Sequence, residues 1–295
     1  MTTSKTLIFF GTDDFSAPSL TMLIENGYDI RAVVTKPDTK KGRGLKVSPS
    51  LVKEIATKHS IPVWQPEKLD DIADNIAAMG SVTGILVSYG KIISQHIIDL
   101  FTPGIINVHP SLLPHYRGST PIESAIANGD TQMGISIMRL SAKMDAGPVY
   151  AYALLDLDGT ETQADLYERA AHEGAQELRK VLPLILDGSC TVVDQDETQA
   201  TYTQLLTKAD SVLDEVHLTA EQCERKIRAH LVFPKTKITI NDHLIIVTKA
   251  HVVHQAESIL DITCKDSTFL HIDELVAPSG RTMSSAAFLN GYAAG

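Results

Sequence analysis

The sequence predicts an α/β protein in which a Rossmann-like, doubly wound, mostly parallel sheet precedes a small antiparallel β-barrel (OB-like) domain. Two observations predict this class. Apolar runs alternate with helical patterns over roughly the first two-thirds of the 295 residues, as in parallel sheets with helices on both faces. After a polar stretch, short segments alternate apolar and polar residues, as antiparallel strands do. We therefore expect a first domain over residues 1–188, a linker over 189–206 and a β-barrel domain over 207–295.

The elements of the first domain follow from apolar runs and helix-end signals. Five apolar runs predict parallel strands: residues 6–11, 30–35, 61–65, 84–88 and 104–108. Helical patterns cover residues 16–27, 48–59, 94–101, 121–129 and 162–186. Ser16 is a capping residue for the first of these helices and Gly27 is its stop. For the second helix, Ser48 is the expected cap and Pro49 the first helical residue.

The remaining strands are predicted from alternation. Residues 133–140 and 148–156 alternate apolar and polar side chains, so we expect two half-exposed strands there. In the second domain, Thr219 and Gln222 form a capping box that opens a helix over residues 219–231. Four alternating segments predict antiparallel strands: residues 235–242, 243–253, 258–264 and 268–276.

The composition indicates an ordinary globular protein. The chain is 43% hydrophobic with a mean hydropathy of +0.01, and no apolar run approaches the ~20 residues that span a bilayer. The N-terminal residues lack the features of a signal peptide. The three cysteines are far apart and odd in number, which favours a reducing compartment over a disulfide framework or a zinc site. We therefore expect a cytoplasmic protein without membrane contact.

The charge distribution limits the ways in which nucleic acid could bind. A net charge of −10 counts against wholesale binding, because phosphate contacts need clustered Lys and Arg. Two local clusters nevertheless occur, over residues 35–46 and 225–237. Either cluster taken alone is most simply a solvated basic surface. Two of them in an acidic chain leave an RNA contact open.

Several enzyme classes are excluded by missing motifs. The turn after the first strand reads "GTDDFSAP" instead of G-x-G-x-x-G, and its two aspartates would repel a pyrophosphate. The chain contains no G-x-S-x-G and no H-E-x-x-H, and its 11 histidines show no metal-ligand spacing. We therefore expect neither a nicotinamide cofactor nor a metal.

A pair of polar residues ends the strand predicted over residues 104–108. Asn107 and His109 are two positions apart, so their side chains point to the same face of the sheet. Ligands of open α/β sheets bind beyond the carboxyl ends of the strands. An amide N–H and an imidazole at one point suit a reaction in which a carbonyl oxygen gains negative charge. Asp145, in a turn between the two alternating strands, is the best candidate for a carboxylate that orients the imidazole.

Taken singly, each of these residues also has a structural explanation. Asn107 could cap the following loop, His109 could be a core histidine, and Asp145 could be a turn former. A longer pattern distinguishes the two interpretations. Segments that resemble the folate-dependent formyltransferases occur in order along nearly the whole chain: "FFGTDDFSAPSL", "VVTKPDTKKGRGLKVSP", "VSYGKII", "INVHPSLLPHYRG", "MDAGPV", "VVDQDETQATY", "IRAH" and "PSGRTMSSAAFLNG". The resemblance extends into the second domain, which formyltransferases of purine synthesis lack.

The resemblance implies a function and assigns roles. It implies formyl transfer from 10-formyltetrahydrofolate to the α-amine of initiator methionyl-tRNA by a monomeric enzyme. Asn107 would donate to the oxyanion, and His109, held protonated by Asp145, would stabilise the same charge. The folate would bind against Ser111, Leu112, Leu113 and Pro114, with the pterin beside Ser88, Tyr89 and Gly90. The tRNA would contact Lys40, Lys41, Arg43, Lys46, Arg225, Lys226 and Arg228.

Two departures and two rivals accompany this resemblance. The second domain has "HLVFP" where the family has an aromatic-Asn-Pro-aromatic-Pro segment, and Leu213-Asp214-Glu215 where it has Ile-Asp-Trp. One alternative function keeps the chemistry but transfers the formyl group to water or an amino sugar. The second domain and the basic cluster over residues 35–46, which we call the basic loop, argue against this alternative. The other rival is a non-catalytic RNA-binding protein, against which the intact Asn107, His109 and Asp145 argue.

Overall fold

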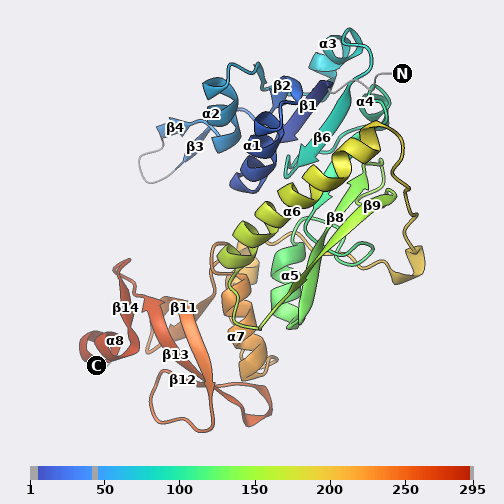
Figure 1. Cartoon of the computed structure of the whole chain (residues 1–295). Coiled ribbons are helices and arrows are strands. Elements are labelled where there is room, and N and C mark those ends of the chain that lie inside the picture. Colours follow the sequence, from blue (N-terminus) through green and yellow to red (C-terminus); the bar gives the residue numbers. More distant parts are fainter. Residues whose placement is uncertain (1–5, 42–45, 293–295) are drawn as a thin grey trace. The chain divides into compact units, whose positions relative to one another are not determined.

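The computed structural model describes residues 6–41 and 46–292, which form two compact units (Figure 1). Unit 1 runs to Gly118 and adds Met133–Leu155 and Tyr167–Tyr202. Unit 2 consists of Ser119–Gln132, Asp156–Leu166 and the chain from Thr203 onward. Each unit therefore combines stretches that are separated in the sequence. Among the described residues, no helix is both long and apolar enough to cross a membrane.

Unit 1 is built on a seven-stranded sheet. Its strands, in spatial order, are β5 (Val63–Trp64), β2 (Asp29–Val34), β1 (Thr6–Gly11), β6 (Thr83–Val87), β7 (Ile105–His109), β8 (Gln132–Arg139) and β9 (Val149–Asp156). The first five are parallel, whereas β8 runs antiparallel to β7. From β1 the chain first builds toward β5 and then returns to add β6 and β7 on the other side. This order confirms the doubly wound, mostly parallel sheet.

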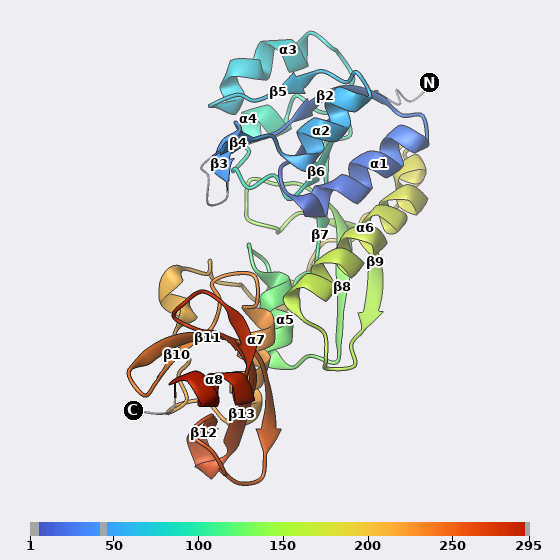
Figure 2. The same ribbon diagram turned by 90° about the vertical axis from the view of Figure 1, so that its left-hand side faces the viewer.

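Helices cover both faces of this sheet (Figures 1 and 2). The helices are α1 (Ala17–Glu25), α2 (Leu51–Lys58), α3 (Ala73–Ala77), α4 (Gln95–Ile98) and α6 (Gln163–Leu186). The apolar side chains of α3 and α4 share a buried cluster with Ile8 and Phe10 of β1. On the opposite face, α6 approaches β7 so closely that a Cβ at Gly174 would lie 2.8 Å from a methyl group of Val108.

Unit 2 contains the second domain and α5 (Pro121–Asn128). Its antiparallel strands are β10 (Lys237–Ile240), β11 (His243–Val253), β12 (Asp261–Thr263), β13 (Phe269–Val276) and β14 (Thr282–Ser284). The spatial order is β10-β11-β13-β12, with β14 paired to β13, which makes a half-barrel. The helices are α7 (Ala220–Ala229), which packs against α5 and β11, and α8 (Ser285–Tyr292). The small antiparallel β domain is thereby confirmed.

The second helix begins later than the sequence pattern predicts. Ser48 ends a strand, and Ser50 is the residue whose hydroxyl accepts from Lys53 N at 3.2 Å. Pro49 therefore precedes the cap instead of following it. The capping box of Thr219 and Gln222 is confirmed, because both of its reciprocal hydrogen bonds are present.

Other differences come from tertiary packing. β8 was expected to be half exposed, yet all six of its central residues are buried, because α6 covers one face and the loop after β7 covers the other. The basic loop contains a short hairpin of β3 (Thr39–Lys41) and β4 (Lys46–Ser48). Short 3₁₀ turns, none of them predicted, lie at Asp14–Ser16, Leu69–Ile72, Glu197–Gln199, Lys208–Ser211 and Lys265–Ser267.

Candidate active site

The site lies where the order of the strands reverses, beyond the carboxyl ends of β1, β6 and β7. The chain leaves β1 toward β2 and leaves β6 toward β7, so the loops that follow these strands diverge on the two sides of this point. Open α/β sheets bind ligands at such a reversal. The loops concerned are residues 12–16, 88–92 and 110–118.

Asn107 and His109 project from the end of β7 on one face. The register places Phe10, Leu86 and Asn107 opposite one another across β1, β6 and β7, so Asn107 faces the side of the sheet that α3 and α4 cover. Both side chains are 5% exposed. Within the described part of the chain, the Asn107 amide has no hydrogen-bond partner. A nearly buried amide with free N–H groups is available to a ligand.

His109 has an acceptor oxygen near each of its ring nitrogens. The carbonyl oxygen of Tyr116 lies 3.1 Å from Nε2, and the Asp145 carboxylate lies 3.9 Å from Nδ1. The ring is thus held between the Tyr116 carbonyl and the Asp145 carboxylate, on the same face of the strand as the Asn107 amide.

Asp145 belongs to the loop between β8 and β9, which we call the Asp145 loop (residues 140–148). Its carboxylate Oδ2 accepts from the backbone N–H of Gly118 at 2.8 Å. Its backbone has a φ of +45°, in the left-handed region that few residues other than glycine adopt. Such a conformation persists only where surrounding contacts hold it. The side chain that faces His109 thus depends on support from neighbouring segments.

The residues expected to bind folate directly after β7 form a closely bonded turn. The hydroxyl of Ser136 on β8 donates to Ser111 O at 2.6 Å and accepts from Leu113 N at 3.0 Å. Ser111 and Leu113 are buried, whereas Leu112 and Pro114 are partly exposed. The hydroxyl of Tyr152 donates to Leu113 O at 2.9 Å. The turn is therefore anchored to β8 and β9, and its exposed side chains lie next to the polar pair.

The second expected folate segment, residues 88–90, is tied to the loop after β1. Thr12 donates to Ser88 O from its backbone at 3.2 Å and to Tyr89 O from its hydroxyl at 3.0 Å. The Tyr89 side chain is buried in the core, and this burial raises its pKa to about 12. Gly90 is exposed, with a φ of +68°. The Tyr89 ring is therefore withdrawn from a ligand, whereas the backbone at Gly90 and the partly exposed Ser88 are open to one.

Asp13 bonds to the same segment. Its carboxylate accepts from the Ser88 hydroxyl and, at 3.1 Å, from Phe15 N. Burial nevertheless raises the pKa of Asp13 above its ordinary value, because desolvation outweighs these hydrogen bonds. The two aspartates after β1 thus differ, and Asp14 only begins the following 3₁₀ turn.

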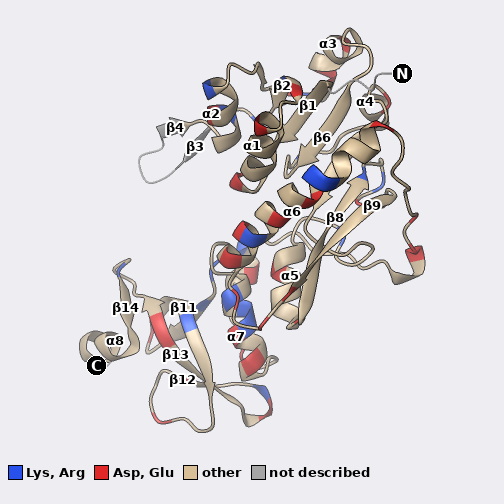
Figure 3. Ribbon diagram, viewed as in Figure 1, with Lys and Arg blue, Asp and Glu red and all other residues tan. Residues whose placement is uncertain are grey.

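The residues expected to contact RNA fall into two groups. Arg43 lies outside the described residues, and for Lys40, Lys41 and Lys46 only the backbone is described. The other group, Arg225, Lys226 and Arg228, lies on α7, which carries charges of both signs (Figure 3).

The basic residues of α7 differ in availability. Arg228 binds both carboxylate oxygens of Glu224 at 2.6 and 2.9 Å and the carbonyl of Glu161 at 2.7 Å. Lys226 Nζ donates to Val212 O at 2.7 Å. Arg225 lines a cavity of about 400 Å³ within unit 2. Of the three, Arg228 is the least available to a phosphate.

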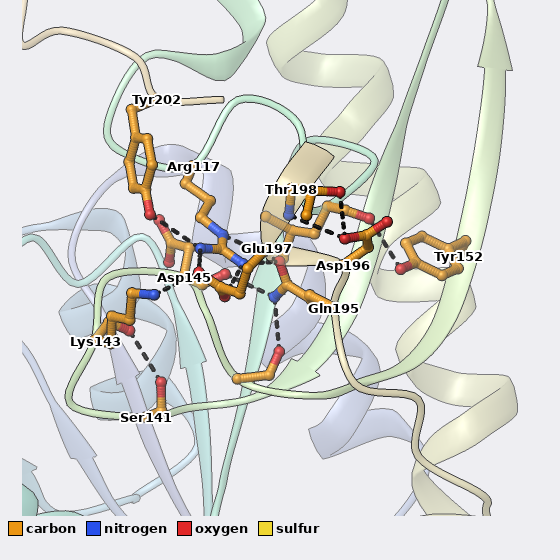
Figure 4. Close-up of polar contacts among 12 residues, drawn as sticks. Arg117, Ser141, Lys143, Asp145, Tyr152, Gln195, Asp196, Glu197, Thr198 and Tyr202 are labelled. Atoms are coloured by element: carbon orange, nitrogen blue, oxygen red, sulfur yellow. Dashed lines mark hydrogen bonds and ion pairs between the residues drawn. The ribbon is translucent and has the colours of Figure 1, made fainter. Parts of the chain in front are cut away.

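Sequence reasoning missed a group of residues around Asp145 that Figure 4 shows. Arg117 and Lys143 meet Gln195 and Glu197, which lie in the stretch expected to be a linker. Arg117 lies in the segment "INVHPSLLPHYRG", and Gln195 and Glu197 lie in "VVDQDETQATY". Both segments were quoted for the formyltransferase resemblance, which was the available signal, but no pattern in the sequence assigned a role to these three residues. Among the described residues, no cluster of three or more metal-ligating side chains is present.

Family models match both parts of the chain. A formyl transferase model matches residues 4–182, and a formyl transferase C-terminal domain model matches residues 205–293. The chain is 38% identical to a methionyl-tRNA formyltransferase of Sulfurihydrogenibium sp. over 84% of its own length and 80% of that protein. It is 33% identical to the methionyl-tRNA formyltransferase of Methylococcus capsulatus over 97% of both chains.

Solved structures share the fold at lower identity. An N-formyltransferase from Helicobacter canadensis, in complex with folinic acid and dTDP-3-aminofucose, is 18% identical with a TM-score of 0.69, over 91% of this chain and 98% of that one. The sugar 3N-formyl transferase WlaRD, solved with dTDP and 5-N-formyl-THF, is 19% identical with a TM-score of 0.68, over 92% and 97%. At these identities the likeness concerns the fold alone.

Proposed function

The chain belongs to the methionyl-tRNA formyltransferase family, and we propose that Asn107, His109 and Asp145 are the residues with which it transfers the formyl group. The enzyme formylates methionyl-tRNA for translation initiation, and its family uses folate-derived formyl donors. We further propose 10-formyltetrahydrofolate as the donor. The proposal is carried by the Asn107 amide, which has no hydrogen-bond partner among residues 6–41 and 46–292, together with a His109 ring between two acceptors.

The chemistry requires charge stabilisation at one oxygen. The neutral α-amine attacks the formyl carbon, so a C–N bond forms and negative charge develops on the formyl oxygen. Asn107 Nδ2 would donate to this oxyanion, and the His109 imidazolium beside it would stabilise the same charge. As the bond from carbon to N10 broke, the proton of the attacking amine would pass to N10, and His109 would relay it. Asp145 would keep the imidazole protonated and oriented.

The donor would supply an activated formyl carbon, and the chain offers two segments to hold it. The turn of Ser111, Leu112, Leu113 and Pro114 presents partly exposed apolar side chains beside the polar pair. Ser88, Tyr89 and Gly90 present backbone groups that suit the hydrogen-bonding edge of a pterin. Both segments follow strands that adjoin the reversal point of the sheet, which supports the assignment.

The acceptor is proposed to be initiator methionyl-tRNA bound through basic residues. Lys40, Lys41, Arg43 and Lys46 would contact the acceptor stem, with Arg225 and Lys226 extending the contact. Arg228 would have to leave Glu224 before it could bind a phosphate. We propose that the enzyme acts as a monomer in the cytoplasm, a location consistent with its three free thiols.

The proposal is tested by following a labelled formyl group. The enzyme is supplied with labelled 10-formyltetrahydrofolate and methionyl-tRNA, and label is measured in formylmethionyl-tRNA and in free formate. We expect the label in the aminoacyl-tRNA; label found mainly in formate would identify a hydrolase instead.

Substitutions at the site test the roles of the residues. Asn107→Ala and His109→Ala should each lower kcat by at least ~10²-fold with little change in folate affinity, since each removes a group that acts only as charge develops. Asp145→Asn should be comparably damaging while the fold, followed by circular dichroism, survives. Near-normal turnover of either alanine variant would rule out the oxyanion role.

A further inference from the structure

Arg117 is a charged side chain that is completely buried. Its guanidinium is 0% exposed and carries five N–H donors, all of which are hydrogen-bonded. Nε and Nη2 donate to the Gln195 side-chain oxygen at 3.1 and 2.8 Å, and both Nη atoms donate to the Glu197 carboxylate. Nη1 also donates to the Tyr202 hydroxyl at 3.0 Å. All of these acceptors come from residues 193–202, which we call the linker segment (Figure 4).

The linker segment belongs to unit 1 and is hydrogen-bonded to other parts of that unit at both of its ends. At its start, Val193 and Val149 exchange two backbone hydrogen bonds of 2.8 and 2.9 Å. At its end, Arg117 N donates to Thr201 O at 2.9 Å, and Thr201 N donates to Pro114 O at 3.1 Å. The segment therefore runs from β9 to the loop after β7, and the Asp145 loop lies between these two attachments.

Gln195 connects Arg117 to the Asp145 loop. Its amide oxygen accepts from Arg117, which turns the amide nitrogen toward the loop. From there Nε2 donates to the carbonyl oxygens of Asp145 and Gly147, at 2.8 and 2.7 Å. Because a guanidinium can only donate, Arg117 prevents the amide from flipping. The orientation of Gln195 is thus fixed by a buried charge.

The contacts around Asp145 hold a strained backbone. The φ of +45° at Asp145 needs support from outside the loop. Gln195 donates a hydrogen bond to the Asp145 carbonyl oxygen, and Gly118 N donates one to the Asp145 carboxylate. Lys143 of the same loop is paired with Glu197 of the linker segment. A rotation of the Asp145 backbone would carry its carboxylate away from His109. The hydrogen bond from Gln195 to the Asp145 carbonyl oxygen therefore also stabilises the contact between Asp145 and His109.

We propose that Gln195, oriented by the buried Arg117, is a positioning residue that holds the carboxylate of Asp145 at His109. The inference rests on the catalytic role proposed for Asp145. It assigns to the linker segment a part in formyl transfer besides connecting two parts of the chain. Misplacing a reacting group by about 1 Å can cost on the order of 10²-fold in rate, so the loss of the two Gln195 hydrogen bonds should be visible in kcat.

The test compares two glutamines of the linker segment. Gln195→Met keeps the size of the side chain and removes both N–H donors. Gln199→Met is the matched control, because within the described residues the Gln199 side chain has no hydrogen-bond partner. We expect Gln195→Met to lower kcat roughly 10- to 100-fold, with KM for methionyl-tRNA and for the folate changed by no more than about twofold. Gln199→Met should leave both parameters unchanged.

A double-mutant cycle separates positioning from a merely structural role. If Gln195 acts through the Asp145 carboxylate, Gln195→Met should change the single-turnover rate by less than about twofold once Asp145→Asn is present. Equal losses in the wild-type and Asp145→Asn backgrounds would overturn the proposal. If Asp145→Asn alone keeps normal turnover, the proposed role of Asp145 fails, and this result is independent of what Gln195→Met does.

A second substitution covers the case in which Gln195→Met fails to fold. Gln195→Glu retains an oxygen for Arg117 but has no N–H for the two carbonyls. It should reproduce the loss in kcat at an unchanged KM. A folded Gln195→Glu enzyme with normal kcat would overturn the proposal as well.

Discussion

His230 follows α7 as a histidine buried in the core of unit 2. The side chain is 7% exposed, and Nδ1 has no hydrogen-bond partner within the described residues. Burial lowers its pKa to about 4, with a further lowering by Lys226 that Asp210 partly opposes. The folded protein therefore holds this ring neutral at a pH where the unfolded chain would protonate it.

The sign of the pH dependence follows from this depressed pKa. Between about pH 6.5 and 4 the unfolded chain binds a proton at His230 that the folded chain does not. Stability from His230 is fully present above pH 6.5 and is lost as the pH falls toward 4, by on the order of 3 kcal/mol. We expect the hydrogen-exchange protection factors of the α7 amides, taken relative to the intrinsic exchange rate at each pH, to fall correspondingly on acidification. His230→Gln should flatten the trend, whereas substitution of the exposed His59 should not; an unchanged slope in His230→Gln would contradict the assignment.

Site residues could be predicted from the sequence where the local backbone geometry determines the face to which their side chains point. Asn107 and His109 were found because alternation along a strand is independent of the rest of the fold. Asp145 was identified with the help of a turn and of the formyltransferase resemblance. Gln195 lies in a segment that carries the formyltransferase resemblance, but its role could not be found, since its partner carbonyls are 50 and 48 positions away. Long-range hydrogen bonds to backbone leave no pattern in the side chains.

At the scale of elements, the β8–β9 connection leaves no room for a side chain at Gly147. A Cβ there would lie 1.8 Å from the carbonyl oxygen of Arg139, while Arg139 N bonds Pro148 O at 2.9 Å. The loop would have to move away from β8, and the Asp145 carboxylate would move with it. We expect Gly147→Ala to lower kcat by at least roughly 10-fold while the sheet, followed by circular dichroism, stays folded.

Gly291 provides the matched control for this substitution. Among the described residues, no atom lies within 4 Å of a Cβ built at Gly291, so Gly291→Ala should leave kcat unchanged. If Gly147→Ala were as active as Gly291→Ala, the Asp145 loop would tolerate displacement, and tight positioning of the carboxylate would not be needed.

Strands and helices were predicted best where a continuous pattern of apolar residues within the segment itself identified them. The strands β1, β2, β6 and β7 lie where apolar runs placed them, because parallel strands are buried on both faces. The start of α2 was displaced because three serine and proline residues in succession offer more than one capping geometry, and tertiary contacts decide among them. The burial of β8 could not be predicted, since alternation shows which residues share a face but not whether another element covers the second face.

At the scale of the whole molecule, the two units interleave along the chain. Unit 2 takes α5 and Asp156–Leu166 from the part of the sequence that otherwise builds unit 1. Reading patterns along the chain predicted consecutive domains, because the pairing of α5 with α7 depends on contacts about a hundred positions apart. The linker boundary at 189–206 remains a prediction, and cutting the chain there tests it.

A cut near residue 205 should leave the two pieces bound to each other. Leu205 is 73% exposed, so a specific protease site can be inserted after it. The pieces would still share the contact of α5 with α7, the bond from Arg228 to Glu161 O at 2.7 Å and the bond from Val232 N to Gln163 at 3.0 Å. We expect them to co-elute in size-exclusion chromatography and to separate only in denaturant, with folate binding retained by the complex. Because unit 2 is built from both sides of the cut, separation in plain buffer would mean that residues 206–295 fold without α5, and that consecutive domains describe the chain better than interleaved units.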